Sequence, residues 1–154
     1  GRHGMVITRE FGPRVRFGKI FTNAPMAFDN QIEFGVTKFC ENCRKCTDAC
    51  PPKAIPDGEP SPVKLNLSSI SGVKKWSVDG EKCFSYWGKI VSDCMICMRV
   101  CPYNKDFTKF RHKIGLRLAS TKLRNIMLML NDFFDYGERL KPKAWWNGES
   151  RRRI

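Results

Sequence analysis

The chain has 154 residues, a formal net charge of +13 and 42% hydrophobic residues. Its length fits one domain, or a small domain with appendages, and its hydrophobic content is ordinary for a globular protein. The sequence has no run of 18 apolar residues, which predicts no transmembrane helix. The first residues, GRHG, lack the apolar segment of a signal peptide, and a start at Gly1 rather than Met suggests a piece of a longer protein.

The N-terminal part is predicted to form a β-hairpin. Residues 5–9 and 14–22 are rich in β-branched and aromatic side chains, and Glu10-Phe11-Gly12-Pro13 between them is typical of a turn. Alternation along the second strand places Arg14 and Arg16 on the same face. An irregular connection over residues 23–35 is expected to follow.

The middle of the chain holds all eight cysteines, in two blocks. The first block reads Cys40-x2-Cys43-x2-Cys46-x3-Cys50-Pro51, and the second reads Cys83-x10-Cys94-x2-Cys97-x3-Cys101-Pro102. A proline-rich loop at residues 56–62 separates them, and short helices are expected around Lys82–Trp87 and Asp93–Val100. Three cysteines at two-residue intervals can place three thiolates on one face of a [4Fe–4S] cubane, and the proline after each fourth cysteine turns the chain away.

The fourth cysteine of each block points away from its own loop. In two-cluster ferredoxins that sulfur ligates the other cluster. The spacing therefore predicts two [4Fe–4S] clusters with crossed ligands. Cluster 1 takes Cys40, Cys43, Cys46 and Cys101, and cluster 2 takes Cys50, Cys83, Cys94 and Cys97. The interval of ten residues before Cys94 departs from the symmetric ferredoxin pattern, so Cys83 is the ligand that the spacing specifies least.

Disulfides and zinc are the alternatives for these cysteines. Disulfides need an oxidising compartment and would not predict two blocks that both end in x3-Cys-Pro. Zinc sites favour two cysteine pairs separated by a spacer, which a run of three cysteines at two-residue intervals does not resemble. The pattern favours iron–sulfur clusters over both.

The C-terminal part is predicted to form a helix over residues 120–136. Ser120 or Thr121 can cap its start, and Gly137 can close its end. Its apolar side chains recur at spacings of three and four, at Leu123, Ile126, Met127, Leu130, Phe133 and Phe134. This face can pack on the protein itself or lie on a membrane surface, and Trp145-Trp146 with Arg151–Arg153 would suit either role.

The positive charge is concentrated after the cysteine blocks. Residues 109–154 hold twelve Lys and Arg against four acidic residues, so they carry +8 of the total of +13. Such a patch can steer an acidic redox partner, contact anionic lipid headgroups or simply be solvated. No nucleic-acid-binding motif accompanies the charge, and no nucleic acid is expected as a partner.

The cysteine region resembles that of the corrinoid-dependent reductive dehalogenases. The resemblance lies in residues 39–51 (FCENCRKCTDACP), in Trp76 ahead of residues 82–87 (KCFSYW), and in residues 93–97 (DCMIC) leading to 101–105 (CPYNK). Upstream, GRHG and the stretch EFGPRVR at residues 10–16 resemble the last part of that family's cobalamin-binding domain. The resemblance covers residues 1–110, and the tail matches only loosely.

This resemblance implies an α+β fold: a ferredoxin-like module for two [4Fe–4S] clusters, a preceding β-hairpin and a C-terminal helix. Residues 1–35 would end a corrinoid-binding domain, 36–110 would hold the clusters, and 111–154 would form a helical basic tail. The implied function is delivery of electrons from a low-potential donor, through the clusters, to a cobalamin that removes halide from an organohalide. The chain would then be part of an oxidoreductase that is not active alone. Peripheral membrane contact is expected, with the compartment either the outer face of a membrane or the cytoplasm.

The implied catalytic machinery lies mostly outside this sequence. In the family the proton donor is a tyrosine upstream of Gly1, and none of Tyr86, Tyr103 and Tyr136 matches it. Arg14 and Arg16 are candidates for a basic group that faces the active site and stabilises a tyrosinate or the departing halide, against the alternative of solvated arginines. His3 is interpreted as a structural or cofactor-edge residue, because no partner ligand lies near it in sequence.

Two other functions stay open. Epoxyqueuosine reductase, a tRNA-modification enzyme, also combines cobalamin with two such clusters, although Trp76 and Tyr86-Trp87 look more like the dehalogenases. The third hypothesis is a free-standing dicluster ferredoxin that only carries electrons. A length of 154 residues favours it, while a dehalogenase-like hairpin at residues 5–22 speaks against it.

Overall fold

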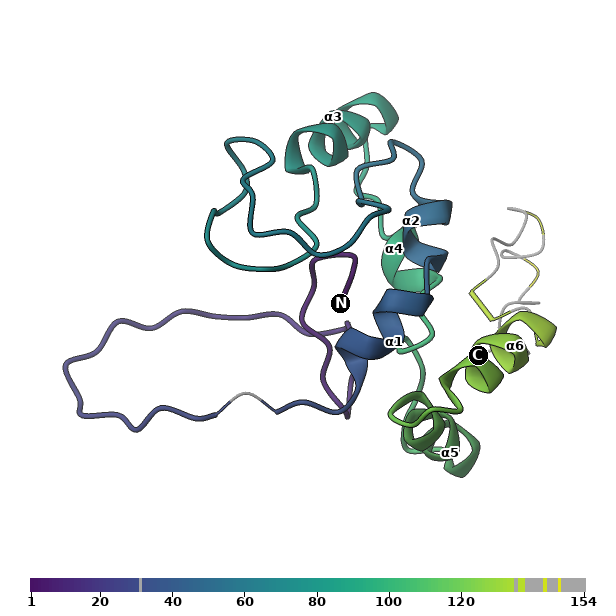
Figure 1. Cartoon of the computed structure of the whole chain (residues 1–154). Helices are drawn as coiled ribbons and strands as arrows, with labels where there is room; N and C mark the ends of the chain where they lie inside the picture. Colours follow the sequence, from purple (N-terminus) through teal and green to yellow (C-terminus); the bar gives the residue numbers. More distant parts are fainter. Residues whose placement is uncertain (31, 135, 138–142, 144–146, 148–154) are drawn as a thin grey trace.

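The described chain is built from short helices and long connections. The computed structural model describes residues 1–30, 32–134, 136, 137, 143 and 147 (Figure 1). Within these residues no β-strand forms, and the helices are small. They are α1 (Val36–Asn42), α2 (Lys45–Ala49), α3 (Gly80–Ile90), α4 (Ile96–Arg99), α5 (Phe110–Ala119) and α6 (Arg124–Phe133).

The cysteine-bearing helices lie at the centre of the molecule. Helices α2 and α4 contact each other, and α3 lies beyond them at the top of Figure 1. The aromatic core beside them is formed by Phe39 of α1 and Tyr103, whose rings meet edge to face with centroids 5.1 Å apart. Cysteines make up much of the buried apolar surface, because Cys43 and Cys101 pack in this core and Cys46 and Cys50 in a second one with Ile55.

The two helices predicted in the second cysteine block are present. Helix α3 begins after Asp79, whose carboxylate accepts a hydrogen bond of 3.0 Å from the backbone N–H of Lys82, and it ends at Val91 in a left-handed conformation. Helix α4 covers only Ile96–Arg99, so the prediction over Asp93–Val100 was right in place and too long. A side-chain cap and a left-handed end are the local signals that delimit α3.

The β-hairpin expected at residues 5–22 is not formed. A turn does close at residues 9–11, with a single antiparallel bridge between Thr8 and Gly12, but no strand extends from it. A two-stranded hairpin is marginal in water unless a third strand or a packed face supports it. Within the described residues no such support exists, so the α+β prediction is corrected here to helices and irregular connections.

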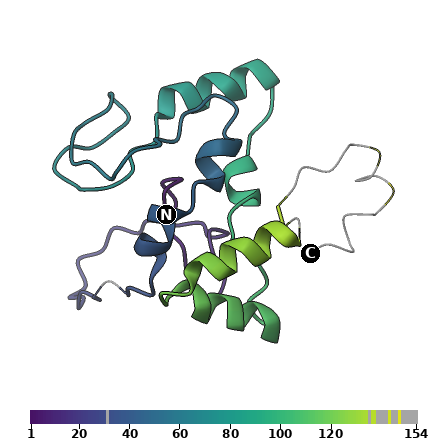
Figure 2. The same ribbon diagram turned by 45° about the vertical axis from the view of Figure 1, so that its right-hand side comes forward.

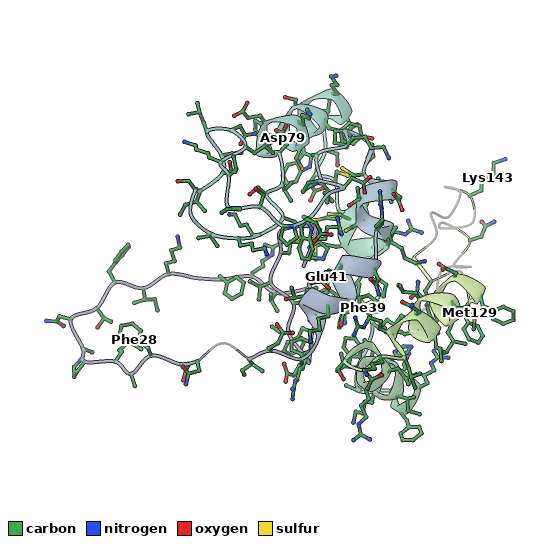
Figure 3. All side chains as sticks on the ribbon, in the orientation of Figure 1. Phe28, Phe39, Glu41, Asp79, Met129 and Lys143 are labelled. Atoms are coloured by element: carbon green, nitrogen blue, oxygen red, sulfur yellow. The ribbon has the colours of Figure 1, made fainter. Side chains whose placement is uncertain are left out.

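Residues 14–30 run away from the helices as an extended loop, at the left of Figure 1. Their apolar side chains are open to solvent, and Phe28 is fully exposed at the far end of the loop (Figure 3). Phe17 and Ile20, in the second predicted strand, are 71% and 91% exposed. A contiguous stretch of exposed apolar residues is typical of a surface that contacts another protein segment.

The helix predicted over residues 120–136 corresponds to the shorter α6, and α5, which was not predicted, precedes it. The two helices lie side by side in both views (Figures 1 and 2). Ser120 and Thr121 do not cap α6. Their hydroxyls donate to the carbonyls of Arg117 and Leu118, at 2.7 and 2.8 Å, and so satisfy the last turn of α5. Gly137 is left-handed as expected but lies beyond the C-cap of α6 at Phe134. Trp145, Trp146 and Arg151–Arg153 lie outside the described residues.

Only part of the predicted apolar face of α6 is buried. Met127 packs in the core, while Phe133 is 77% exposed and Met129 points outward (Figure 3). Lys45 of α2 forms an ion pair with Asp132 of α6 and so ties the helix pair to the cysteine region. No helix within the described part of the chain is both long and apolar enough to cross a membrane.

Gly12 is the glycine that this fold requires most clearly. Its φ is +59°, and a Cβ atom there would collide with the carbonyl oxygen of Tyr103. Gly12→Ala should therefore lower the free energy of unfolding by about 2–4 kcal/mol, from left-handed strain and overpacking together. Gly18→Ala is the matched control, because a Cβ at Gly18 meets no atom within 4 Å. Urea unfolding of both variants checks this, and equal stabilities would contradict it.

Candidate metal centres

Cys101 lies with the first three cysteines of the other block. Cys40 and Cys46 come from α1 and α2, Cys43 caps the end of α1, and all are buried. The pKa of Cys101 is raised, first by burial and then by the negative charges of Cys40, Cys43 and Cys46. Four cysteine sulfurs, from both blocks, therefore share one neighbourhood, which we call group 1.

Cys50 lies with the cysteines of the second block. It follows α2, while Cys83 is in α3 and Cys97 is in α4. Burial raises the pKa of Cys97, and the charges of Cys94, Cys50 and Cys83 raise it further. Burial likewise raises the pKa of Cys83, with smaller contributions from Cys50 and Cys94. These four cysteines form group 2, so the two groups have the same members as the two predicted ligand sets.

The two groups adjoin each other. Burial raises the pKa of Cys46 to about 12, and the neighbours that add to this effect include Cys97 of group 2 as well as Cys43 and Cys40. The contact between α2 and α4 provides this proximity. Cofactors held by the two groups would therefore be close neighbours.

Backbone N–H groups are directed at the sulfurs. The N–H of Ala54 lies 3.4 Å from the sulfur of Cys50. At four other cysteines burial raises the pKa of the thiol, and a hydrogen bond from a backbone N–H group opposes that effect. The donor–cysteine pairs are Arg2 with Cys40, Lys45 with Cys43, Met98 with Cys97 and Tyr103 with Cys101. Such donors stabilise thiolates and tune the potentials of iron–sulfur clusters.

Tyr103 supplies an unsatisfied donor beside group 1. Its side chain is fully buried, and its hydroxyl has no hydrogen-bond partner among the described residues. The pKa of this phenol is raised, first by burial and then by the charges of Cys40, Cys101 and Cys43, so the hydroxyl keeps its proton. A buried O–H without an acceptor is costly. A sulfur-rich cofactor held by group 1 would offer that acceptor, so the residues fit such a group.

A single metal ion fits less well. Among the described residues, no three His, Cys, Asp or Glu side chains converge on a point that could hold one ion. In a cubane each thiolate binds a different iron atom, so the four sulfurs surround a cluster rather than one ion. The arrangement therefore favours clusters over the zinc alternative, and all eight cysteines are unpaired rather than in disulfides.

Arg2 joins the N-terminal segment to the first cysteine loop. Its side chain is only 3% exposed, and its guanidinium lies over the ring of Trp76, 4.8 Å from the centroid. The Nε group donates to the carbonyl of Cys40 at 3.1 Å. The terminal nitrogens donate at 3.0–3.4 Å to the carbonyls of Glu41, Pro56, Asp57 and Gly58. Sequence inspection missed Arg2, because an isolated arginine 38 residues before the first cysteine carries no local signal.

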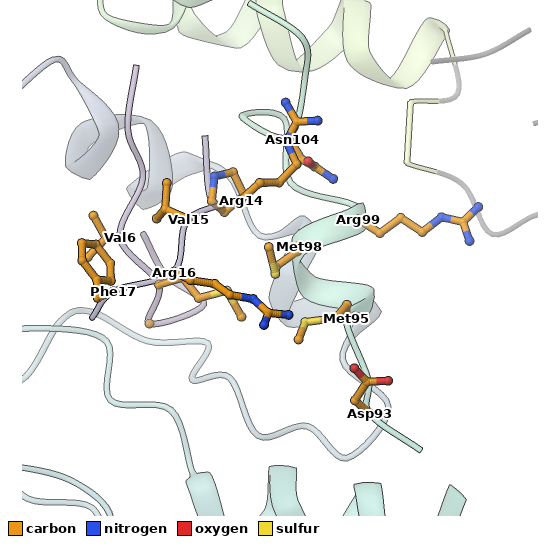
Figure 4. Close-up of a pocket in the computed structure, with 13 residues that line it drawn as sticks. Val6, Arg14, Val15, Arg16, Phe17, Asp93, Met95, Met98, Arg99 and Asn104 are labelled. Atoms are coloured by element: carbon orange, nitrogen blue, oxygen red, sulfur yellow. The ribbon is translucent and has the colours of Figure 1, made fainter. Parts of the chain in front are cut away.

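The arginines that were predicted to share a face line the same pocket. This pocket of about 710 Å³ lies between the N-terminal segment and α4 (Figure 4). The Arg16 side chain extends toward Met95, and Arg14 lies near Asn104. Arg14 is held by backbone, because its Nη2 donates to the carbonyl of Lys105 at 2.9 Å. The two arginines thus line a largely apolar pocket beside α4, to which Asp93, Arg99 and Asn104 also contribute.

His3 is buried and neutral. Burial lowers its pKa to about 4, and its Nδ1 accepts a hydrogen bond of 3.1 Å from the backbone N–H of Met5. Its Nε2 has no partner within the described residues. With Nδ1 as an acceptor, the proton lies on Nε2, so this nitrogen is not disposed to bind a metal here. The prediction of a structural or cofactor-edge histidine is in keeping with this geometry.

Comparison with known proteins shows that the chain is similar to parts of iron–sulfur enzymes. Residues 39–104 match the family model of a 4Fe-4S double cluster binding domain. The tetrachloroethene reductive dehalogenase of Sulfurospirillum multivorans is 38% identical over 149 residues, which are 96% of this chain and 30% of that protein. The tetrachloroethene reductive dehalogenase of Desulfitobacterium hafniense is 36% identical, over 92% of this chain and 26% of the relative. The chain thus spans less than a third of these relatives.

A second class of enzyme and a solved structure also match this chain. Epoxyqueuosine reductase of Atelocyanobacterium thalassa is 30% identical over 177 residues, which cover 94% of this chain and 49% of that protein. The structure of the catabolic reductive dehalogenase NpRdhA superposes with a TM-score of 0.63 and 31% identity, over 75% of this chain and 16% of the other. The two clusters predicted from the cysteine spacing, and the resemblance to reductive dehalogenases carried by the surrounding residues, are both confirmed.

Proposed function

We propose that this chain, which belongs to the reductive dehalogenase family and corresponds to its iron–sulfur part, carries electrons through two [4Fe–4S] clusters to a cobalamin in the full-length protein. The observation that carries the proposal is the sorting of eight cysteines into two adjoining groups, each with a cysteine borrowed from the other block. Group 1 is assigned to cluster 1 and group 2 to cluster 2. When bound, the clusters supply one-electron transfer and the corrinoid supplies the reductive cleavage of a carbon–halogen bond.

The residues of this chain have three roles in that function. The cysteines hold the clusters, and backbone N–H groups orient and stabilise the thiolates. Burial of group 1 keeps water from its sulfurs. Arg14 and Arg16 line the pocket beside α4, and we assign this pocket to the side that faces the corrinoid and the organohalide. A guanidinium there would stabilise a departing halide by a charge-assisted contact.

The proposed domain organisation follows the same division. Residues 1–35 would belong to the corrinoid-binding domain, whose remainder would pack on the exposed loop at residues 14–30. Residues 36–110 would form the two-cluster domain, and 111–154 a helical basic tail. The exposed Met129 and Phe133 of α6 support peripheral contact with a membrane. A low-potential donor would deliver electrons to the clusters.

The first test is metal content. After anaerobic reconstitution the chain should hold about eight iron and eight acid-labile sulfide, because two cubanes each contain four of both. Iron and sulfide analysis together with elemental analysis for zinc makes the measurement. Stoichiometric zinc without sulfide would contradict the proposal, and half the expected iron would mean that one of the two groups holds no cluster.

An epoxyqueuosine reductase-type enzyme is the second candidate function. An epoxyqueuosine reductase is 30% identical over almost the whole chain, which supports this candidate. It ranks second because identity to the dehalogenases named above reaches 38%. Both enzyme classes would use the clusters in the same way, so cluster content does not separate them. Incubation of the full-length protein with a chlorinated ethene and with epoxyqueuosine-containing tRNA distinguishes the classes, because only a dehalogenase releases halide.

A further inference from the structure

Among the described residues, the buried cation of Arg2 has no carboxylate partner. None of the ion pairs found among the described residues includes it, and its five hydrogen bonds all go to backbone carbonyls. Carbonyl dipoles solvate a guanidinium only partly, and a buried charge without an opposite charge is costly. A negative group nearby would therefore stabilise this cation further.

The negative group that fits is the cluster of group 1. Among the influences on Cys40, Cys43 and Cys46, burial is the largest and raises their pKa values, but the positive charge of Arg2 acts on all three in the opposite direction. An oxidised [4Fe–4S] cluster with four thiolates carries a net charge of about −2, and reduction adds one more negative charge. The guanidinium is held at the first cysteine loop by its hydrogen bond to the Cys40 carbonyl, on the side of group 1.

We propose that Arg2 sets the reduction potential of cluster 1, by stabilising the reduced cluster more than the oxidised one. This inference rests on the proposed assignment of group 1 to a [4Fe–4S] cluster. The attraction between a fixed cation and the cluster grows with the negative charge of the cluster, and the buried surroundings weaken it less than water would. Arg2 also holds the Cys40 carbonyl with its side chain and the Cys40 sulfur with its backbone N–H, so its charge has a fixed position.

Substitution of Arg2 gives the direct test. In the reconstituted chain, Arg2→Gln should move the potential of cluster 1 to a more negative value and leave that of cluster 2 nearly unchanged. Arg2→Lys keeps the charge but not the planar fork, so its shift should be clearly smaller. The readout is a redox titration followed by electron paramagnetic resonance, with iron and sulfide measured on each sample. Equal shifts in the two variants, or no shift in either, would overturn the inference.

A second pair of variants tests the same charge without removing Arg2. The Gly58 carbonyl accepts hydrogen bonds of 3.0 Å from both Arg2 and Trp76, and a Cβ at Gly58 meets no atom within 4 Å. Gly58→Asp would place a carboxylate near the guanidinium and should also lower the potential of cluster 1, by less than Arg2→Gln. Gly58→Asn is its neutral control of the same shape and should not. This pair decides the matter if Arg2→Gln fails to fold.

The outcomes separate this inference from the proposed function. If the wild-type chain assembles no clusters, the iron–sulfur function itself fails. If it holds both clusters but the Gly58→Asp and Gly58→Asn variants titrate at the same potential as the wild type, only the role of Arg2 fails. A shift confined to cluster 2 would likewise refute the inference and assign the charge effect to the other site.

Discussion

Cys50→Ser should abolish the cluster that the second cysteine block holds, and should spare the cluster of its own block. Cys50 follows α2 in an extended conformation, and its sulfur lies with those of Cys83 and Cys97. A serine hydroxyl is a poor replacement for a thiolate ligand, because it stays protonated near neutral pH. Iron content should therefore fall from about eight to about four per chain.

Comparing the spectra of matched variants identifies which cluster is lost. In the dithionite-reduced state, Cys50→Ser should leave the same electron paramagnetic resonance spectrum as Cys94→Ser, because both remove cluster 2. Cys101→Ser should instead leave the same spectrum as Cys40→Ser. A Cys50→Ser spectrum that matched Cys43→Ser would show that each block binds its own cluster, and the crossed assignment would then be wrong.

The cysteine region could be predicted from the sequence because its information is local. Spacings of two and three residues determine how short helices such as α2 and α4 present their sulfurs, and the proline after each fourth cysteine ends the motif. The start of α6 is also determined locally, but the role of Ser120 in it was predicted wrongly. Ser120 can cap a following helix or close a preceding one, and its hydrogen bond to the Arg117 carbonyl shows that the second role prevailed.

The other differences arise from long-range contacts. The segment at residues 5–22 has strand-like composition, yet strands require partners that the described residues do not supply. Arg2 is the opposite case, since its five acceptors lie 38 to 56 residues further along the chain. Motif spacing describes neighbours in sequence and therefore does not predict contacts between residues so far apart. Tyr103 was considered only as an acid, although its buried hydroxyl beside group 1 suits it to donate a hydrogen bond.

Alkaline pH should destabilise the metal-free protein. Burial raises the pKa of Cys43 from 9.0 to about 11 and that of Cys46 from 9.0 to about 12. Between pH 9 and 12 the unfolded chain therefore loses protons that the folded protein keeps, and the free energy of unfolding falls as the pH rises. Each thiol contributes a slope of up to about 1.4 kcal/mol per pH unit, and its contribution to stability is complete only below pH 9.

The cluster-loaded protein should respond to pH in the opposite sense, because bound cysteines are thiolates and protons compete with iron for them. Retention of iron against a chelator should increase between pH 6 and 8, whereas urea unfolding of the metal-free protein, kept reduced, should weaken from pH 9 to 11. Cys46→Ala is the control for the second measurement, since its unfolding should depend less steeply on pH while lysines and tyrosines titrate as before. If Cys46→Ala unfolded with the same dependence on pH as the parent chain, the Cys46 thiol would already be ionised in the fold. The cysteine groups would then be prepared for iron before it binds, and burial would not be the dominant influence on their protons.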